Sequence, residues 1–117
     1  MKIKRRQDAP AVETPDYTAV TKQVVLGPDD GSKEIVLRYF SVAKGGATPY
    51  HSHDFPHLVK IEAGQGVAVD VDKRQTTVVA GDYVYVDSDE IHNFENTGDE
   101  PFEFICIVPV RGEARKA

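Results

Sequence analysis

Hydrophobic and polar positions alternate along this chain in short runs, which is the pattern of half-buried β-strands rather than of amphipathic helices. From residue 23 onward, clusters of Gly, Asp, Ser and Asn separate these runs and are typical of turns. The predicted strands cover residues 24–26, 33–43, 57–63, 67–72, 76–80, 83–86, 92–96 and 101–110. No segment carries a convincing helical period. The pattern therefore predicts an all-β protein.

The N-terminal part of the chain looks different from the rest. Residues 7–18 are rich in proline and acidic side chains, so we expect them to be irregular. We predict an N-terminal arm over residues 1–22, made of a strand and this irregular segment, followed by one β-barrel domain over residues 23–117. A chain of 117 residues has the usual size of one domain with one hydrophobic core.

Alternation also predicts which side chains share a face, because a strand sends every second side chain the same way. His57 shares its face with Val59 and Ile61, whereas Leu58, Lys60 and Glu62 take the other face. His92 shares its face with Phe94. Both histidines are therefore expected to point into the barrel.

The four histidines of the chain all fall in or next to predicted strands. His51, His53 and His57 lie within the segment HSHDFPH, and the strand pairs that follow can bring His92 back beside them. A lone histidine is more often a surface or core residue, but four on converging faces favour a metal site. Convergent imidazoles suit manganese, iron, nickel, copper or zinc far better than calcium or magnesium.

These residues resemble the first sequence motif of the cupin superfamily, G-x5-H-x-H-x3,4-E-x6-G. Gly45, His51, His53 and Gly64 match it, and His57 stands where the family usually has Glu.

The second cupin motif, G-x5-P-x-G-x2-H-x3-N, is also recognisable. Gly81, His92 and Asn96 match it, whereas Asp87 and Asp89 replace its Pro and Gly.

The resemblance covers residues 35–108 and implies a single-domain cupin (jelly-roll) β-barrel. The chain is most similar to small four-histidine cupins, some of which are manganese, iron or copper proteins with oxygenase-type activity. By this resemblance the cofactor is one divalent transition metal ion, with manganese or iron favoured and zinc, nickel or copper as alternatives. Its predicted ligands are His51, His53, His57 and His92.

The replacement of Glu by His57 changes the charge of such a site. A site of three His and one Glu carries one compensating negative charge, whereas a site of four His carries none. The ion then keeps its full double charge, so it should be a stronger electrophile and should stabilise a higher oxidation state less well. A six-coordinate ion would keep two adjacent positions for water, substrate or dioxygen.

Alternation further predicts a substrate pocket formed by Arg38, Phe94, Phe104 and Cys106 on the inner face, beside the metal. In one interpretation Arg38 clamps a substrate carboxylate or stabilises negative charge that develops on a metal-bound oxygen. In the other, its guanidinium reaches solvent or a structural carboxylate. Cys106 is either a soft pocket residue or a small buried hydrophobe. These two residues are the only catalytic candidates, and neither is assigned a catalytic role.

The predicted function is that of a metal-dependent oxygenase acting on a small organic substrate that chelates the ion or enolises. The alternative is a non-catalytic module that binds or senses a metal or a small molecule. The fold alone does not separate them, because one fold hosts many functions.

Composition narrows the partners and the compartment. A net charge of -5 argues against nucleic acid as a partner. Cys106 is the only cysteine, so a reducing compartment is expected, and neither a secretory signal nor an apolar membrane span is recognisable. We therefore expect a cytoplasmic protein with no membrane partner. A homodimer is also expected, because a small barrel with an extended arm leaves strand edges that a second copy would cover.

Overall fold

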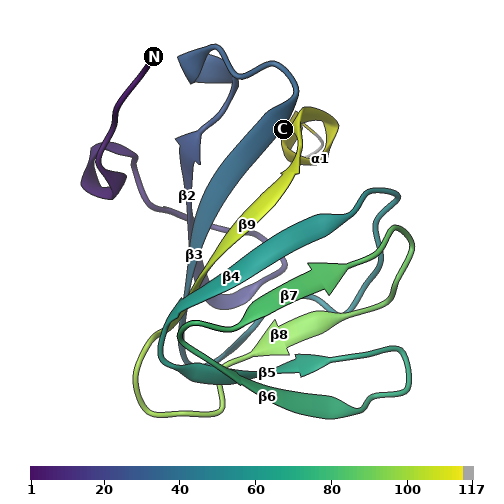
Figure 1. Cartoon of the computed structure of the whole chain (residues 1–117). Coiled ribbons are helices and arrows are strands. Elements are labelled where there is room, and N and C mark those ends of the chain that lie inside the picture. Colours follow the sequence, from purple (N-terminus) through teal and green to yellow (C-terminus); the bar gives the residue numbers. More distant parts are fainter. Residues whose placement is uncertain (115–117) are drawn as a thin grey trace.

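Nine β-strands form one antiparallel sheet within residues 1–114, the part of the chain that the computed structural model describes. The sheet curls into the jelly-roll barrel that the sequence predicted, so the all-β fold class is confirmed (Figure 1). The strands are β1 (Val12–Glu13), β2 (Thr18–Leu26), β3 (Ile35–Ala47), β4 (His57–Ala63), β5 (Gln65–Val69), β6 (Gln75–Val79), β7 (Tyr83–Val86), β8 (Asn93–Glu95) and β9 (Phe102–Pro109).

The strands follow the order β6-β5-β8-β3-β9-β4-β7, and β2 adds to β3 and carries β1. All of these pairs are antiparallel. β9 therefore lies between β3 and β4, which are the two strands that flank the histidine segment (Figure 1). The predicted arm boundary at residue 22 falls inside β2, and the division of the chain at that point stays a prediction.

Buried side chains alternate along β3 and β9, as the pattern of the sequence predicted. The buried residues are Val36, Arg38, Phe40 and Val42 on β3, and Phe102, Phe104, Cys106 and Val108 on β9. Their rings pack across the strands: Phe40 and Phe104 pair in register, and their ring centroids are 5.3 Å apart. The core of the barrel thus extends to the residues expected to surround the metal.

Two residues of the cupin motifs have structural roles. Gly64 joins β4 to β5 with a φ of 78°, a conformation that side chains other than glycine rarely adopt. Asn96 donates hydrogen bonds from its amide nitrogen to the carbonyl oxygens of Val42 and Glu100, both at 2.9 Å, and accepts one from the backbone N–H of Gly98. Asn96 therefore ties the end of β8 to β3 and to the turn before β9.

Several strand boundaries differ from the predicted ones; for example, β2 begins at Thr18 rather than at residue 24, and β3 extends to Ala47 rather than to residue 43. The strand predicted over residues 67–72 ends at Val69, because the Asp70 carboxylate accepts hydrogen bonds from the backbone N–H groups of Asp72 and Arg74 and turns the chain. The strand predicted over residues 101–110 ends at Pro109, because the chain turns into a short helix from Val110 onward, although the Val110 N–H still donates to the Glu34 carbonyl oxygen at 2.9 Å.

Three short helices, none of them predicted, occur in the described residues. They are the α-helix α1 (Val110–Ala114) and the 3-10 helices η1 (Arg6–Asp8) and η2 (Pro28–Asp30). None of the helices in residues 1–114 is long and apolar enough to cross a membrane. η1 and β1 interrupt the segment that was expected to be irregular.

An apolar groove of about 530 Å³ lies on the outer face of β3, β9, β4 and β7. Leu58, Tyr83 and Tyr85 line this groove and are 55%, 76% and 60% exposed. Apolar side chains this exposed on one sheet face are typical of surfaces that contact another protein.

The homodimer stays a prediction, and we propose this outer face as the surface that a second copy covers. Leu58→Glu should then yield monomers, because the interface would have to bury an unpaired carboxylate. Light scattering measures the mass. Val79→Glu is the matched control, since Val79 is a partly exposed apolar residue on β6, outside the groove. A wild-type chain that is monomeric at high concentration would contradict the proposal.

Candidate metal centre

Three separate segments bring histidines together inside the barrel. His53 lies in the loop after β3, His57 is the first residue of β4, and His92 directly precedes β8. The backbones of His51 and His92 are paired: each N–H donates to the other carbonyl oxygen at 3.1 Å. This antiparallel bridge holds the histidine loop against the segment that carries His92.

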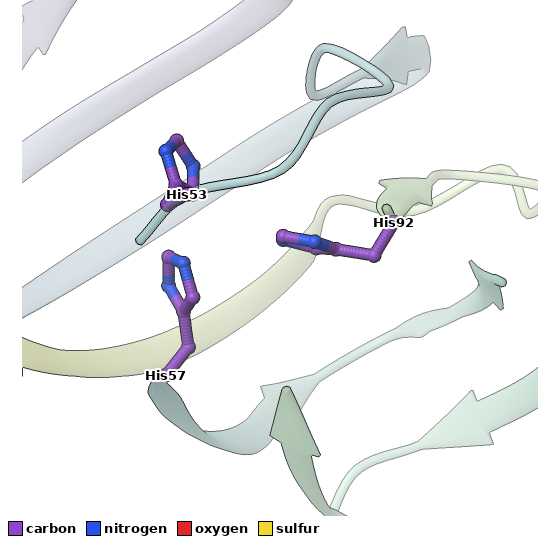
Figure 2. Close-up of side chains that lie close together, drawn as sticks. All are labelled: His53, His57 and His92. Atoms are coloured by element: carbon purple, nitrogen blue, oxygen red, sulfur yellow. The ribbon is translucent and has the colours of Figure 1, made fainter. Parts of the chain in front are cut away.

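The side chains of His53, His57 and His92 converge on one point (Figure 2). One ligand nitrogen from each lies within 4.8 Å of those of the other two. Nitrogens that share an ion at about 2.0–2.1 Å are themselves about 3–4 Å apart, so small ring rotations complete such a site. His57 Nε2 is buried and has no hydrogen-bond partner within the described residues, as expected of an atom that binds an ion. The residues present therefore fit a metal ion.

His51 stands beside this cluster. Its ring centroid is 4.2 Å from that of His53 and 6.2 Å from that of His92, but its nitrogens lie outside the converging group. The sequence argument placed His51 and His53 on one face of an extended segment. That segment is not a regular strand here, so spacing alone does not determine where the His51 ring points.

Burial keeps two of the converging imidazoles in the form that binds metal. Burial, together with the neighbouring His92 and His53, lowers the pKa of His57 to about 3. Burial also lowers the pKa of His92, although a hydrogen bond to the Glu90 carbonyl oxygen partly opposes it. That bond engages His92 Nδ1 at 2.9 Å, which leaves Nε2 for an ion. Both rings are neutral at neutral pH.

Aromatic rings surround the histidines on the core side. A small cavity of about 30 Å³ is lined by the four histidines together with Tyr17, Arg38, Phe40, Thr48, Phe94, Phe104 and Cys106. All four residues of the predicted pocket are in this lining. Phe94 and Phe104 are in contact, with ring centroids 5.1 Å apart. No carboxylate of residues 1–114 lines the cavity, so these walls supply no negative charge to the site.

Three of the lining residues, Tyr17, Phe40 and Thr48, were not among the predicted site residues. Phe40 shares the buried face of β3 with Arg38, so alternation could have identified it. Tyr17 lies in the segment expected to be irregular, yet it stacks on Phe40 at 6.2 Å with nearly parallel rings. Nothing in the pattern of the sequence indicated that contact.

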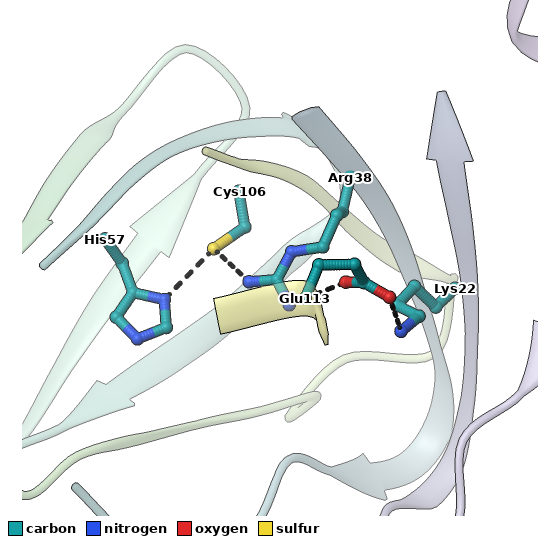
Figure 3. A network of polar contacts seen from close by, with 5 residues as sticks. All are labelled: Lys22, Arg38, His57, Cys106 and Glu113. Carbon is teal, nitrogen blue, oxygen red and sulfur yellow. Dashed lines mark hydrogen bonds and ion pairs between the residues drawn. The ribbon is translucent and has the colours of Figure 1, made fainter. Parts of the chain in front are cut away.

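Arg38 and Cys106 belong to a line of buried polar contacts (Figure 3). Arg38 donates from Nη2 to Cys106 Sγ at 3.1 Å and from Nη1 to Glu113 Oε1 at 3.4 Å. Lys22 Nζ lies 2.7 Å from the other Glu113 oxygen. Arg38 thus has the structural carboxylate that one of its two interpretations requires, and its role toward a substrate stays a prediction.

On the other side, Cys106 Sγ lies 3.2 Å from His57 Nδ1. Burial raises the pKa of the Cys106 thiol, and Arg38 partly opposes this effect. Lys22 and Glu113 were not among the predicted site residues: one falls in the predicted arm and the other on the helix that was not predicted.

A comparison with protein families identifies the class of this fold and site. The family profile described as "Cupin domain" matches residues 38–108, which is more than half of the chain. The chain belongs to the cupin family. Among curated proteins, no match was found.

Solved structures resemble the chain over nearly its whole length. The polyketide cyclase RemF from Streptomyces resistomycificus is 27% identical with a TM-score of 0.87, over 94% of this chain and 80% of that one. A cupin-2 domain protein from Rhodospirillum rubrum is 28% identical with a TM-score of 0.78, over 92% and 74%. A predicted oxalate decarboxylase from Thermotoga maritima is 23% identical with a TM-score of 0.76, over 92% and 98%, which supports the fold alone.

Removing single imidazoles tests the cluster. We expect Ala in place of His53, His57 or His92 to lower Co(II) affinity by more than the 10- to 100-fold that loss of an outer-sphere partner costs. His51→Ala should cost less than these three substitutions, because the His51 nitrogens lie outside the converging group. Isothermal titration and metal analysis of the purified variants measure both effects. Full metal retention by His57→Ala would contradict the predicted ligand set.

Proposed function

We propose that this cupin is a metal-dependent enzyme that acts on a small organic substrate with enolisable carbonyl groups. One divalent ion is held by His53, His57 and His92, with His51 as the fourth ligand. The observation that carries the proposal is the convergence of three imidazoles beside an aromatic wall that contains no carboxylate. A ligand set of this kind supplies no compensating charge.

A divalent ion bound there would act as a Lewis acid that polarises a carbonyl oxygen of the substrate. Because every protein ligand is neutral, the donor set favours this chemistry over a change of oxidation state.

The protein side chains contribute binding and exclusion of water. Phe94 and Phe104 present apolar ring surfaces toward the histidines, and such surfaces favour a flat, conjugated substrate. Phe40 and Tyr17 extend this aromatic wall behind them. An apolar wall also keeps bulk water from the reacting carbonyls.

The reaction we propose is an intramolecular cyclisation that joins two carbons of one carbonyl-rich molecule without oxidation. The similarity to RemF, a polyketide cyclase, supports this choice, because polyketides are chains of carbonyl groups that enolise readily. The 27% identity to RemF and the all-imidazole ligand set together support this substrate class.

Oxygenation, the reaction predicted from the sequence, is the second candidate. The cavity beside the histidines, about 30 Å³, matches the volume of one water-sized molecule and would also admit dioxygen. The choice of metal separates the two reactions. Manganese and iron, which the sequence resemblance favours, could support either the oxygenation or the cyclisation. Zinc has no redox chemistry, so it could support only the cyclisation.

The reaction can be tested with zinc-loaded and manganese-loaded protein and a panel of 1,3-diketones and longer polyketones. We expect products that are isomers of the substrate or have lost water, detected by mass spectrometry, with no oxygen uptake from either metal form. His57→Ala should be inactive. Phe104→Leu should keep its metal and change the range of substrates.

Other outcomes would contradict the proposed cyclisation. Oxygen consumption in proportion to product, seen with manganese but not with zinc, would establish the oxygenase. Substrate binding without turnover in both metal forms would favour the non-catalytic module.

A further inference from the structure

The sulfur of Cys106 lies between the ring of His57 and the guanidinium of Arg38 (Figure 3). The distances are 3.2 Å to His57 Nδ1 and 3.1 Å to Arg38 Nη2. All three side chains are almost completely buried, with 6%, 4% and 4% exposure for His57, Arg38 and Cys106. Water therefore does not compete for these contacts.

The chemistry of the groups sets the direction of both hydrogen bonds. A guanidinium can only donate, so the sulfur accepts from Arg38. A neutral imidazole that gives Nε2 to an ion carries its proton on Nδ1, so Nδ1–H of a metal-bound His57 also donates to the sulfur. His57 Nε2 is the ring atom without a hydrogen-bond partner in the described residues, which agrees with this assignment.

We propose that Cys106 is the positioning residue for His57: its sulfur holds the imidazole in the Nδ1–H form and turns Nε2 toward the ion. Metal-bound histidines usually donate this second N–H to a carboxylate, a carbonyl or water. Here a thiol sulfur takes that place. The inference rests on the metal site of the proposed function and not on its reaction.

The strand register brings the three residues together. Cys106 on β9 pairs with Arg38 on β3 and with Val59 on β4, and Val59 is two residues after His57 on the same face. The positions of the sulfur and of the imidazole are thus set by the ladder that forms the barrel wall.

The other end of the contact line restrains the guanidinium. Glu113 of α1 lies between Arg38 and Lys22, so one carboxylate is shared by two buried cations. Buried charges without partners are strongly unfavourable, which keeps Glu113 in this position. Glu113 thereby holds the Arg38 guanidinium in place as the second donor to the sulfur. Sulfur is a weak acceptor, so a fixed second donor helps to keep the Cys106 side chain in one orientation. α1 thereby contributes to the geometry of the metal site.

Cys106 is not itself a member of the ligand group. The ligand atoms that converge within 4.8 Å belong to His53, His57 and His92, and the sulfur is not among them. The contact to Nδ1 also places the sulfur behind the His57 ring, on the side away from Nε2. Its action on the ion therefore passes through His57.

Two substitutions at one position distinguish positioning from packing. Cys106→Ala removes the acceptor, and we expect Co(II) affinity to fall about 10- to 100-fold. Cys106→Ser restores an acceptor for both donors, so its affinity should return to within a few-fold of wild type. The visible spectrum of bound Co(II) should change in the Ala variant and be nearly native in the Ser variant.

The stability of the metal-free proteins, measured by chemical unfolding, supplies the control. A Ser hydroxyl also accepts from Arg38 in the metal-free protein, so stability and Co(II) affinity should both rank Cys106→Ser above Cys106→Ala, and a variant outside the contact line is needed to separate the two effects. Ile105→Ala, on the other face of β9, should lower stability and leave affinity unchanged.

An Ile105→Ala variant that loses Co(II) affinity in proportion to its lost stability, or a Cys106→Ala variant that binds Co(II) like wild type, would overturn the inference. Failure of the wild type to bind Co(II) would overturn both this inference and the proposed metal site. Wild-type binding with the expected order of variants, but without turnover of any polyketone, supports this inference and removes only the proposed reaction.

Discussion

The pairing of β9 with both β3 and β4 is the constraint on which the rest of the molecule depends. Through it Phe104 lies opposite Phe40 and Ile61, and Cys106 opposite Arg38 and Val59. A slip of one residue would turn every buried side chain of β9 to the outer face, so the hydrophobic core and the site share one register. The stability of the barrel and the position of the pocket wall are thus set by the same hydrogen-bonded ladders.

Charge is the second constraint on this interior. The imidazoles of His57 and His92 are neutral because burial lowers their pKa values, and the described part of the cavity wall adds no carboxylate. The polar contacts that run from His57 through Cys106 and Arg38 end at the carboxylate of Glu113, which is already paired with Arg38 and Lys22. A divalent ion bound by the histidines would therefore keep most of its charge for the substrate, which is the physical basis of the proposed Lewis-acid chemistry.

The features that repeat along the chain were predictable from the sequence. Period-two alternation identified the buried faces that carry Arg38 and Cys106, and the spacing of His53, His57 and His92 indicated that their side chains converge. These predictions succeed because strand geometry fixes the direction of every second side chain.

Other features depend on contacts that no local pattern encodes. The ring of His51 belongs to an irregular loop, so its direction follows from packing rather than from spacing. Glu113 reaches Arg38 only because the chain leaves β9 after Pro109 and turns into α1. Tyr17 packs on the core from a segment whose composition indicated an irregular loop. Each of these positions is set by contacts between segments that are distant in the sequence, and the alternation of hydrophobic and polar residues does not predict such contacts.

The central claim is that one divalent ion is held by the imidazoles of the histidine cluster while the neighbouring sulfur acts only through His57. X-ray absorption at the zinc edge of the zinc-loaded protein tests it most directly. The account predicts one zinc per chain with three or four nitrogen ligands at about 2.0–2.1 Å and no sulfur ligand. A sulfur ligand at about 2.3 Å, or protein that takes up no zinc, would contradict it.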